Sequence, residues 1–311
     1  MPLAEPTPET LTNPLTRYLL ATRPAFLSAA VLAVLVGLAA ARPEGGLEVI
    51  PALLTLLGAV LVHAGVNVLN DYYDALSGSD GRNTERLFPY TGGSRFIQNG
   101  VLSPAATARF GWGLLAAAAG IGLGLVQRAG PGLLAVGAAG LLVGWGYSAR
   151  WIRLSGRGLG ELAVLLGFGV LIPVGTGWVQ RGGLVPESLL AGVPFGLLAL
   201  DLLFMNQFPD YRADAATGKH HWVVRLGPRR ARWLYGALAL LAYAWVATAV
   251  YLGALPDLVL IALLAAVPSL RAWRDLLRWA DAPALLEPAV RRSINAMLTF
   301  GALLAAGLWW G

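Results

Sequence analysis

Long runs of apolar residues, separated by short polar connections, dominate the pattern along the chain. A helix needs about 20 mostly apolar residues to cross the hydrocarbon core of a bilayer. Nine runs come close to that length. The pattern therefore predicts an all-α membrane protein, a bundle of about nine transmembrane helices at residues 24–41, 50–70, 104–127, 130–147, 158–180, 187–208, 230–252, 256–273 and 288–310.

The first 16 residues do not fit this pattern. They carry Glu5, Glu9 and four prolines, and no basic stretch stands ahead of a short apolar core as in a cleavable signal. We expect residues 1–16 to form a polar N-terminal tail. The rest of the chain, 17–311, is expected to be a single transmembrane domain with cytoplasmic cap loops at about 71–103 and 209–229.

Basic residues are distributed unevenly between the two faces of this predicted bundle. Of the 23 lysines and arginines, 20 fall on the face that holds the N-terminal tail, and the opposite face has only Arg42, Arg128 and Arg181. Cytoplasmic connections are enriched in Lys and Arg. The N-terminus is therefore predicted to be cytoplasmic and the C-terminus outside, in a multi-pass protein of the plasma (inner) membrane.

The amino-acid composition excludes several classes of protein and of site. Hydrophobic residues make up 57% of the 311 positions and charged residues 13%, against about 25% charged in soluble domains. The net charge of +6 follows from the topology and from contact with anionic membrane lipid, so no nucleic acid partner is expected. The absence of cysteine excludes disulfides, a thiolate nucleophile and Cys-ligated metals.

The first acidic motif lies at the predicted cytoplasmic end of the second helix. Asn67, Asp71 and Asp74 stand at positions i, i+4 and i+7, which share one face of a helix. His63 lies one turn earlier on the same stripe, and Asp80 follows shortly after. Carboxylates near a bilayer are costly and are usually functional.

The second acidic motif lies at the corresponding end of the sixth predicted helix. Asn206, Asp210 and Asp214 are again spaced to share one face, and Pro209 would bend or end the helix there. An Asn followed four residues later by Asp thus occurs twice, and Asp71 and Asp210 are 139 positions apart. The repeat suggests two helical units that face each other.

Two facing sets of carboxylates repel each other unless a cation lies between them. Oxygen ligands without cysteine favour a hard ion, most naturally Mg²⁺, which also binds phosphate oxygens. We therefore predict a cytoplasmic Mg²⁺ site for a diphosphate, with the hydrocarbon part of the substrate in the apolar bundle. The expected metal ligands are Asp71, Asp74, Asp210 and Asp214.

Further site residues are expected beside the motifs. Asp80 would be a ligand or a base. Asp201 would be a polar partner between helices or, as the family resemblance given below implies, a base beside the molecule that accepts the transferred group (the acceptor). Contacts to the diphosphate or acceptor are expected from Asn67, Arg82, Tyr147, Arg153, Asn206, Lys219 and His63. Basic loop residues also serve topology, and a lone His is often a packed residue. A cation-coupled transporter is the alternative outside enzymology.

At these residues the chain resembles the UbiA superfamily of membrane prenyltransferases. The resemblance rests on Asn70-Asp71-Tyr-Tyr-Asp74, on Asp210-Tyr-Arg-Ala-Asp214 followed by Gly218-Lys219, and on the Thr22-Arg23-Pro24 start, and it covers nearly the whole chain. It implies a Mg²⁺-dependent enzyme that ionises a polyprenyl diphosphate, after which an aromatic acceptor attacks the allylic carbon.

Within that superfamily the chain is most similar to the MenA branch, the 1,4-dihydroxy-2-naphthoate polyprenyltransferases of menaquinone biosynthesis. Tyr90-Thr91-Gly92-Gly93-Ser94 and Gly158-Leu-Gly160-Glu161-Leu162 carry this similarity. The branch implies loss of CO₂ from the acceptor. After Gly218-Lys219 the branch usually has a basic residue followed by Thr, whereas this chain has His220 and His221. Acceptors that stay open are hydroxybenzoate, a tocopherol or chlorophyll precursor, and a lipid.

Overall fold

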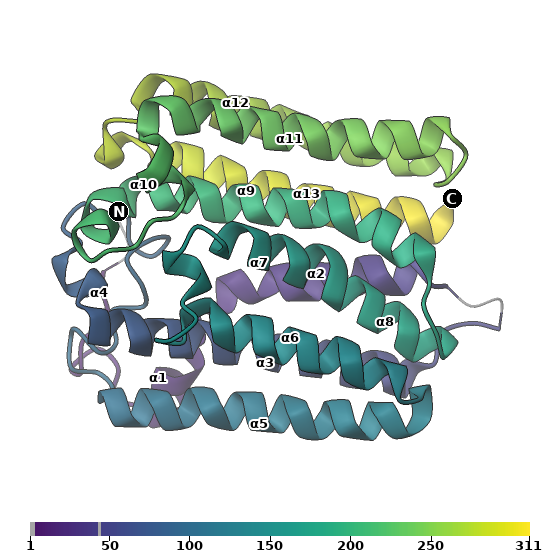
Figure 1. The fold of residues 1–311 in the computed structure, drawn as a ribbon, viewed down its shortest axis with the longest axis horizontal. Helices are drawn as coiled ribbons and strands as arrows, with labels where there is room; N and C mark the ends of the chain where they lie inside the picture. The colour runs from purple at the N-terminus through teal and green to yellow at the C-terminus, as the bar shows by residue number, and fades with distance from the viewer. Residues whose placement is uncertain (1–3, 43–44) are drawn as a thin grey trace.

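The computed structural model describes residues 4–42 and 45–311, and within these ranges every regular element is a helix and there are no strands. Figure 1 shows long helices running side by side along the longest axis of the molecule. The long helices are α2 (Pro24–Ala40), α3 (Val49–Ser77), α5 (Pro104–Ala129), α6 (Gly132–Ser148), α9 (Pro186–Ala216), α11 (Pro228–Tyr251), α12 (Ala266–Trp279) and α13 (Glu287–Trp310).

Shorter elements complete the bundle and its cap. One continuous run comprises α7 (Gly160–Leu166), the π-helical turn η2 (Gly167–Leu171) and α8 (Ile172–Arg181). The 3₁₀ segment η3 (Asp257–Ala265) leads into α12. The remaining elements lie in connections: α1 (Pro14–Ala21), α4 (Ser79–Arg82), η1 (Leu154–Gly156), α10 (Trp222–Leu226) and η4 (Pro283–Leu285).

Helix occupies each of the nine predicted segments, but not all of these helices meet the length of a membrane span. Six are long and apolar enough, namely α3, α5, the run from α7 to α8, α9, α11 and α13. A seventh span results if α1 and α2, which are bent by 55°, count as one. The chain is thus a multi-pass membrane protein, and the count of nine stays a prediction.

The two helices that carry the acidic motifs continue beyond the apolar runs. Helix α3 extends to Ser77 and α9 to Ala216, so that both motifs are helical throughout. Pro209 lies inside α9 and does not end it. Each helix therefore projects about two turns past its apolar part and holds its carboxylates on rigid backbone. Loops and the short helices α4 and α10 surround these projections (Figure 1).

Close contact between small residues fixes the π-helical turn against α9. Gly169 in η2 lies against Gly196, where an added Cβ would come within 2.4 Å of the Gly169 Cα. No side chain larger than hydrogen fits between the two backbones, which is a common basis of helix packing in membranes. Next to this contact, Phe195 is fully buried in a core of apolar residues from α2, α9, α11 and α13.

The two ends of the bundle differ in their charged residues. Arg42, Arg128 and Arg181, assigned by the sequence to the outer face, do gather at one end, where Arg42 donates to the Trp309 carbonyl and Arg181 to the Arg42 carbonyl. The acidic motifs lie at the other end. Helix α1 lies at the motif end and α13 finishes at the opposite end (Figure 1). Which end faces the cytoplasm stays a prediction.

Candidate active site

The two acidic motifs meet at one point, the ammonium group of Lys219. Its Nζ lies 2.8 Å from the Asp74 carboxylate and 3.3 Å from that of Asp214. Burial lowers the pKa of Lys219, but the charges of Asp74 and Asp214 raise it by more, so the pKa lies above its ordinary value. Lys219 is therefore a permanent cation between the ends of α3 and α9.

Asp214 has two further partners that the sequence did not predict. The Ser79 hydroxyl donates to its Oδ1 over 2.5 Å, and His221 Nε2 lies 3.3 Å from its Oδ2. His221 is buried, whereas the neighbouring His220 is bound through its main chain to the Gly156 carbonyl. Of the two adjacent histidines, only His221 contacts the second acidic motif through its side chain.

A tight turn between residues 91 and 94 holds the other two motif carboxylates. The Ser94 amide donates to Asp71 over 3.2 Å, and the Gly92 amide donates to Asp210 over the same distance. Asn83 Nδ2 adds a 2.6 Å hydrogen bond to Asp210. The turn has room only for glycine at position 93, where φ is +75° and an added Cβ would lie 2.5 Å from Asp80 Oδ2.

Asp80 lies on the short helix α4, beside the same turn. It is buried, with Gln98 donating to its carboxylate over 3.3 Å and Arg95 donating to its main-chain carbonyl over 2.5 Å. Burial, followed by the charges of Asp74 and Asp71, raises the pKa of Asp80 well above its ordinary value. Such a carboxyl is suited to accept a cation or to hold a proton.

A cavity of about 1100 Å³ opens from this acidic cluster into the bundle. Its polar end includes Asp74, Asp80, Asp210, Asp214 and Lys219. The rest is lined mainly by apolar residues of α3, α5, α6 and α8. A site with a charged mouth and an apolar interior is shaped for an amphiphile with a polar head and a hydrocarbon tail.

Several other predicted site residues also line this cavity. Asn67 and Asn206, one turn before Asp71 and Asp210, do so, as do His63 and Tyr147. Asn67 donates to the Thr22 carbonyl over 3.1 Å, which ties α3 to the start of α2. The structure thus brings most of the predicted constellation to one surface.

Four predicted residues lie outside the cavity lining, namely Asp71, Arg82, Arg153 and Asp201. Asp71 is buried and accepts the bond from the Ser94 amide. Arg82 and Arg153 donate to the carbonyls of Ala216 and Thr217 at the end of α9, over 3.2 and 3.3 Å. Their contact with a diphosphate stays a prediction. Asp201 is 1% exposed and is buried in the bundle away from the cavity lining.

Two polar residues that support the site had no role assigned from the sequence and entered only through the family resemblance. Asn70 donates to Asp74 over 3.2 Å and to Ser148 over 2.9 Å. Glu161 accepts a 3.1 Å bond from Gln207 and a 2.7 Å bond from the Trp222 amide, so it joins α7, α9 and α10. Besides that resemblance, the signals in the sequence were the polar character of Asn70 inside the first motif and that of Glu161 beside an apolar run.

The carboxylates at the cavity mouth have the ligand chemistry of a divalent metal site, although they do not converge on one point. Within residues 4–42 and 45–311, no three carboxylate or imidazole groups converge closely enough to hold a metal. The chemistry of the set nevertheless fits a hard cation, because Asp74 and Asp214 from the two motifs already share one cationic group, Lys219 Nζ. Their ligand atoms are oxygens, as Mg²⁺ prefers.

Comparison with known proteins agrees with this arrangement. Residues 30–286 match the UbiA prenyltransferase family. A 1,4-dihydroxy-2-naphthoate octaprenyltransferase of Mycobacterium tuberculosis is 33% identical over 93% of this chain and 95% of its own length. The enzyme of that name from Escherichia coli is 31% identical over 92% of this chain and 93% of its own length.

Solved structures share the fold at lower identity. A UbiA homologue from Archaeoglobus fulgidus, bound to DMAPP and Mg²⁺, superposes with a TM-score of 0.66 at 18% identity, over 93% of this chain and 99% of that one. The match extends over the whole helical bundle and not only over the motifs. The chain therefore belongs to the UbiA prenyltransferase family and is an integral membrane enzyme with several transmembrane helices.

Proposed function

We propose that this enzyme transfers a polyprenyl group from a polyprenyl diphosphate to 1,4-dihydroxy-2-naphthoate, with Mg²⁺ as cofactor. The observation that carries the proposal is the meeting of both carboxylate motifs at the mouth of one largely apolar cavity. The names of the relatives from Mycobacterium tuberculosis and Escherichia coli support the acceptor. The DMAPP and Mg²⁺ bound to the archaeal homologue support the donor class and the metal.

The charged mouth of the cavity would bind the diphosphate. Asp71, Asp74, Asp210 and Asp214 would hold Mg²⁺, which when bound supplies charge that stabilises the departing diphosphate. Lys219 adds a buried positive charge at the same point. The apolar walls on α3, α5, α6 and α8 would bind the polyprenyl chain and keep water from the reacting carbon.

The reaction then needs one bond to break and one to form. The allylic C–O bond of the donor breaks, and its electron pair leaves with the diphosphate. A ring carbon of the acceptor forms the new C–C bond. On a carboxylated naphthoate the carboxylate leaves as CO₂ and a proton takes its place on the ring, so that overall the prenyl group replaces CO₂. The ring regains aromaticity as a proton leaves the attacked carbon. The buried carboxylate of Asp80 at the cavity mouth is positioned to take up that proton.

The uneven distribution of basic residues supports a cytoplasmic position for this site. Twenty of the 23 lysines and arginines lie on the face assigned to the cytoplasm, which is the motif end of the bundle. Both proposed substrates would thus meet the enzyme at the inner surface of the plasma membrane.

The test is transfer by the purified protein in detergent or lipid discs. Radiolabelled geranyl diphosphate is offered with 1,4-dihydroxy-2-naphthoate, with and without Mg²⁺. We expect a lipophilic naphthoquinone-type product that requires Mg²⁺ and is lost in Asp71→Ala. Asp257→Ala serves as the matched control, because Asp257 is an exposed carboxylate at the opposite end of the bundle.

Other results would change the assignment in different ways. Transfer only to hydroxybenzoate, a tocopherol or chlorophyll precursor, or a lipid would replace the acceptor and keep the family chemistry. Uptake of an ion-coupled solute by vesicles, without release of diphosphate from any donor, would contradict the enzyme function and favour a transporter.

A further inference from the structure

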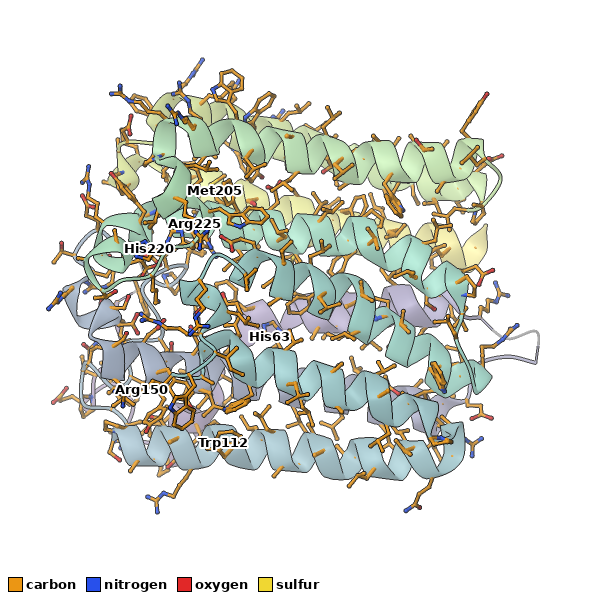
Figure 2. All side chains as sticks on the ribbon, in the orientation of Figure 1. His63, Trp112, Arg150, Met205, His220 and Arg225 are labelled. Atoms are coloured by element: carbon orange, nitrogen blue, oxygen red, sulfur yellow. The ribbon has the colours of Figure 1, made fainter. Side chains whose placement is uncertain are left out.

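His63 is a polar side chain in the apolar part of the cavity. It lies on α3 two turns before Asp71, and its ring lines the cavity. Nδ1 is buried without a hydrogen-bond partner. Nε2 is not among the atoms buried in this way, and because the residue lines the cavity, we infer that Nε2 is accessible from it. Figure 2 shows His63 in the interior, displaced along the bundle from His220 and Arg225 at the motif end.

The hydroxyl groups of this inner region already have hydrogen-bond partners. The hydroxyls of Ser28, Thr55 and Thr176 donate to carbonyls of their own helices, at 2.7, 2.8 and 2.7 Å. At the position on α9 that corresponds to His63, eight residues before Asp210, the cavity is lined by Leu202. Within the described part of the chain, the inner cavity thus offers an unused polar group on its α3 side.

An aromatic ring faces this imidazole. Phe168 and His63 stand edge to face, with centroids 5.0 Å apart and an interplanar angle of 69°. Phe168 belongs to the π-helical turn η2, and such turns frequently occur at functional sites. The contact between Gly169 and Gly196 presses this turn against α9. Phe168 lines the cavity from there.

The polyprenyl chain and the aromatic acceptor differ in how they could contact His63 and Phe168. A polyprenyl chain is pure hydrocarbon and leaves the imidazole without a partner, which is costly in an apolar site. A hydroxylated aromatic ring offers oxygen atoms to His63 and a flat face or edge to Phe168. We propose that His63 and Phe168 form the binding site of the aromatic acceptor, with an acceptor oxygen hydrogen-bonded to Nε2 of His63.

The depth of His63 fits this assignment, which rests on the proposed function. His63 precedes Asn67 by four residues and Asp71 by eight, about 6 and 12 Å along the helix. The reacting allylic carbon is bonded to a diphosphate oxygen and therefore belongs just inside the carboxylates, near Asn67. An acceptor held by His63 at its inner edge would present its outer edge to that carbon.

The test separates binding of the two substrates. In His63→Leu we expect the KM for the acceptor to rise about tenfold, as for one lost hydrogen bond, with the donor KM within about twofold. His63→Gln, which carries an amide near the position of Nε2, should recover most of this loss. Thr55→Val is the matched control, because its hydroxyl is already bound to Pro51.

Equilibrium dialysis of the labelled acceptor without donor gives a readout independent of turnover. Weaker acceptor binding in His63→Leu and in Phe168→Leu, but not in Thr55→Val, is the expected result. The proposal is overturned if His63→Leu raises the donor KM instead, most for longer chains, or if neither KM changes. If the wild type uses a different aromatic acceptor, the same measurements apply to it. Failure with every aromatic acceptor overturns both this inference and the proposed function.

Discussion

The ammonium of Lys219 lies 2.8 Å from the carboxylate of Asp74, a residue 145 positions earlier in the chain. The same ammonium is 3.3 Å from Asp214, so one buried cation joins the ends of α3 and α9. Each motif alone is a short row of carboxylates. Together with Lys219 they form one cluster at the cavity mouth, in which carboxylates still outnumber cations.

Lys219→Met should destabilise the protein most when metal is absent. Removing one partner of a buried ion pair costs about 3–5 kcal/mol, because it leaves uncompensated charge. We expect a lower apparent melting temperature in EDTA, followed by tryptophan fluorescence, and a smaller deficit in Mg²⁺, which supplies another cation. Lys219→Arg, which keeps the charge, is the control. An equal deficit in both buffers would show that Lys219 does not share its position with a metal.

Gly93→Ala should impair catalysis through Asp80. The added Cβ would lie 2.5 Å from Asp80 Oδ2 and 3.1 Å from Asp71 Oδ1, so the turn or the carboxylates must move. We expect kcat/KM to fall by at least about tenfold, which corresponds to about 1.4 kcal/mol of transition-state stabilisation.

Gly100→Ala is the matched control for this change. Gly100 has nearly the same φ of +71°, but nothing lies within 4 Å of its added Cβ. Both variants carry the same backbone strain, and only Gly93→Ala also meets the carboxylates. Equal losses of kcat/KM in the two variants would show that strain in the cap loop, and not contact with Asp80, limits the reaction.

The helical parts of the site could be predicted from spacing alone. The i, i+4, i+7 pattern of Asn67, Asp71 and Asp74 requires only that the helix continue past the apolar run, which it does to Ser77. The same reasoning holds for Asp210 and Asp214, because α9 continues through Pro209. Helical periodicity is a local property, so one sequence suffices to find it.

The contacts between the motifs depend on distant segments and could not be predicted in this way. Nothing in the sequence around Ser79 or Asn83 indicates that they bond to Asp214 and Asp210, more than 120 residues later. The π-helical turn that holds Phe168 depends on the contact of Gly169 with α9. Such features follow from packing of the whole bundle and leave no periodic signal.

Asp201→Asn should leave turnover within about threefold of the wild type. Both carboxylate oxygens of Asp201 are buried without a hydrogen-bond partner among the described residues, and the residue is not part of the cavity lining. A general base would instead lose about 10²–10⁴-fold on this change. Asp80→Asn, at the cavity mouth, is the comparison, and a loss of at least hundredfold is expected there. A comparable loss in Asp201→Asn would assign the base to Asp201.

The N-terminal segment, residues 4–12, covers part of the cavity and is attached through Glu5. Its carboxylate accepts hydrogen bonds from Arg86 Nε over 2.7 Å and from Asn99 over 3.1 Å. Glu5 and Leu11 both line the cavity. Burial raises the pKa of Glu5, but the bonds from Asn99 and Arg86 and the charge of Arg86 lower it by more, so the pKa lies below its ordinary value.

Because the pKa of Glu5 is lowered, the pH dependence of binding of the N-terminal segment can be predicted. A carboxylate with a lowered pKa contributes stability above the pKa of the unfolded chain, about 4.3, and loses it as pH falls through the lower folded value. The segment should therefore stay bound at every pH above about 4.3 and detach only in stronger acid. Glu5→Gln should detach it at neutral pH as well.

The chain has no cysteine, so a nitroxide on Ala4→Cys reports the mobility of this segment without background. In that variant we expect Glu5→Gln to give, at pH 7, the mobile spectrum that the unmodified segment gives only below pH 4. Glu9→Gln, an exposed glutamate on the same segment, should leave the spectrum unchanged. An immobile label in Glu5→Gln would mean that apolar contacts such as those of Leu11 with Phe96 hold the segment without the ion pair.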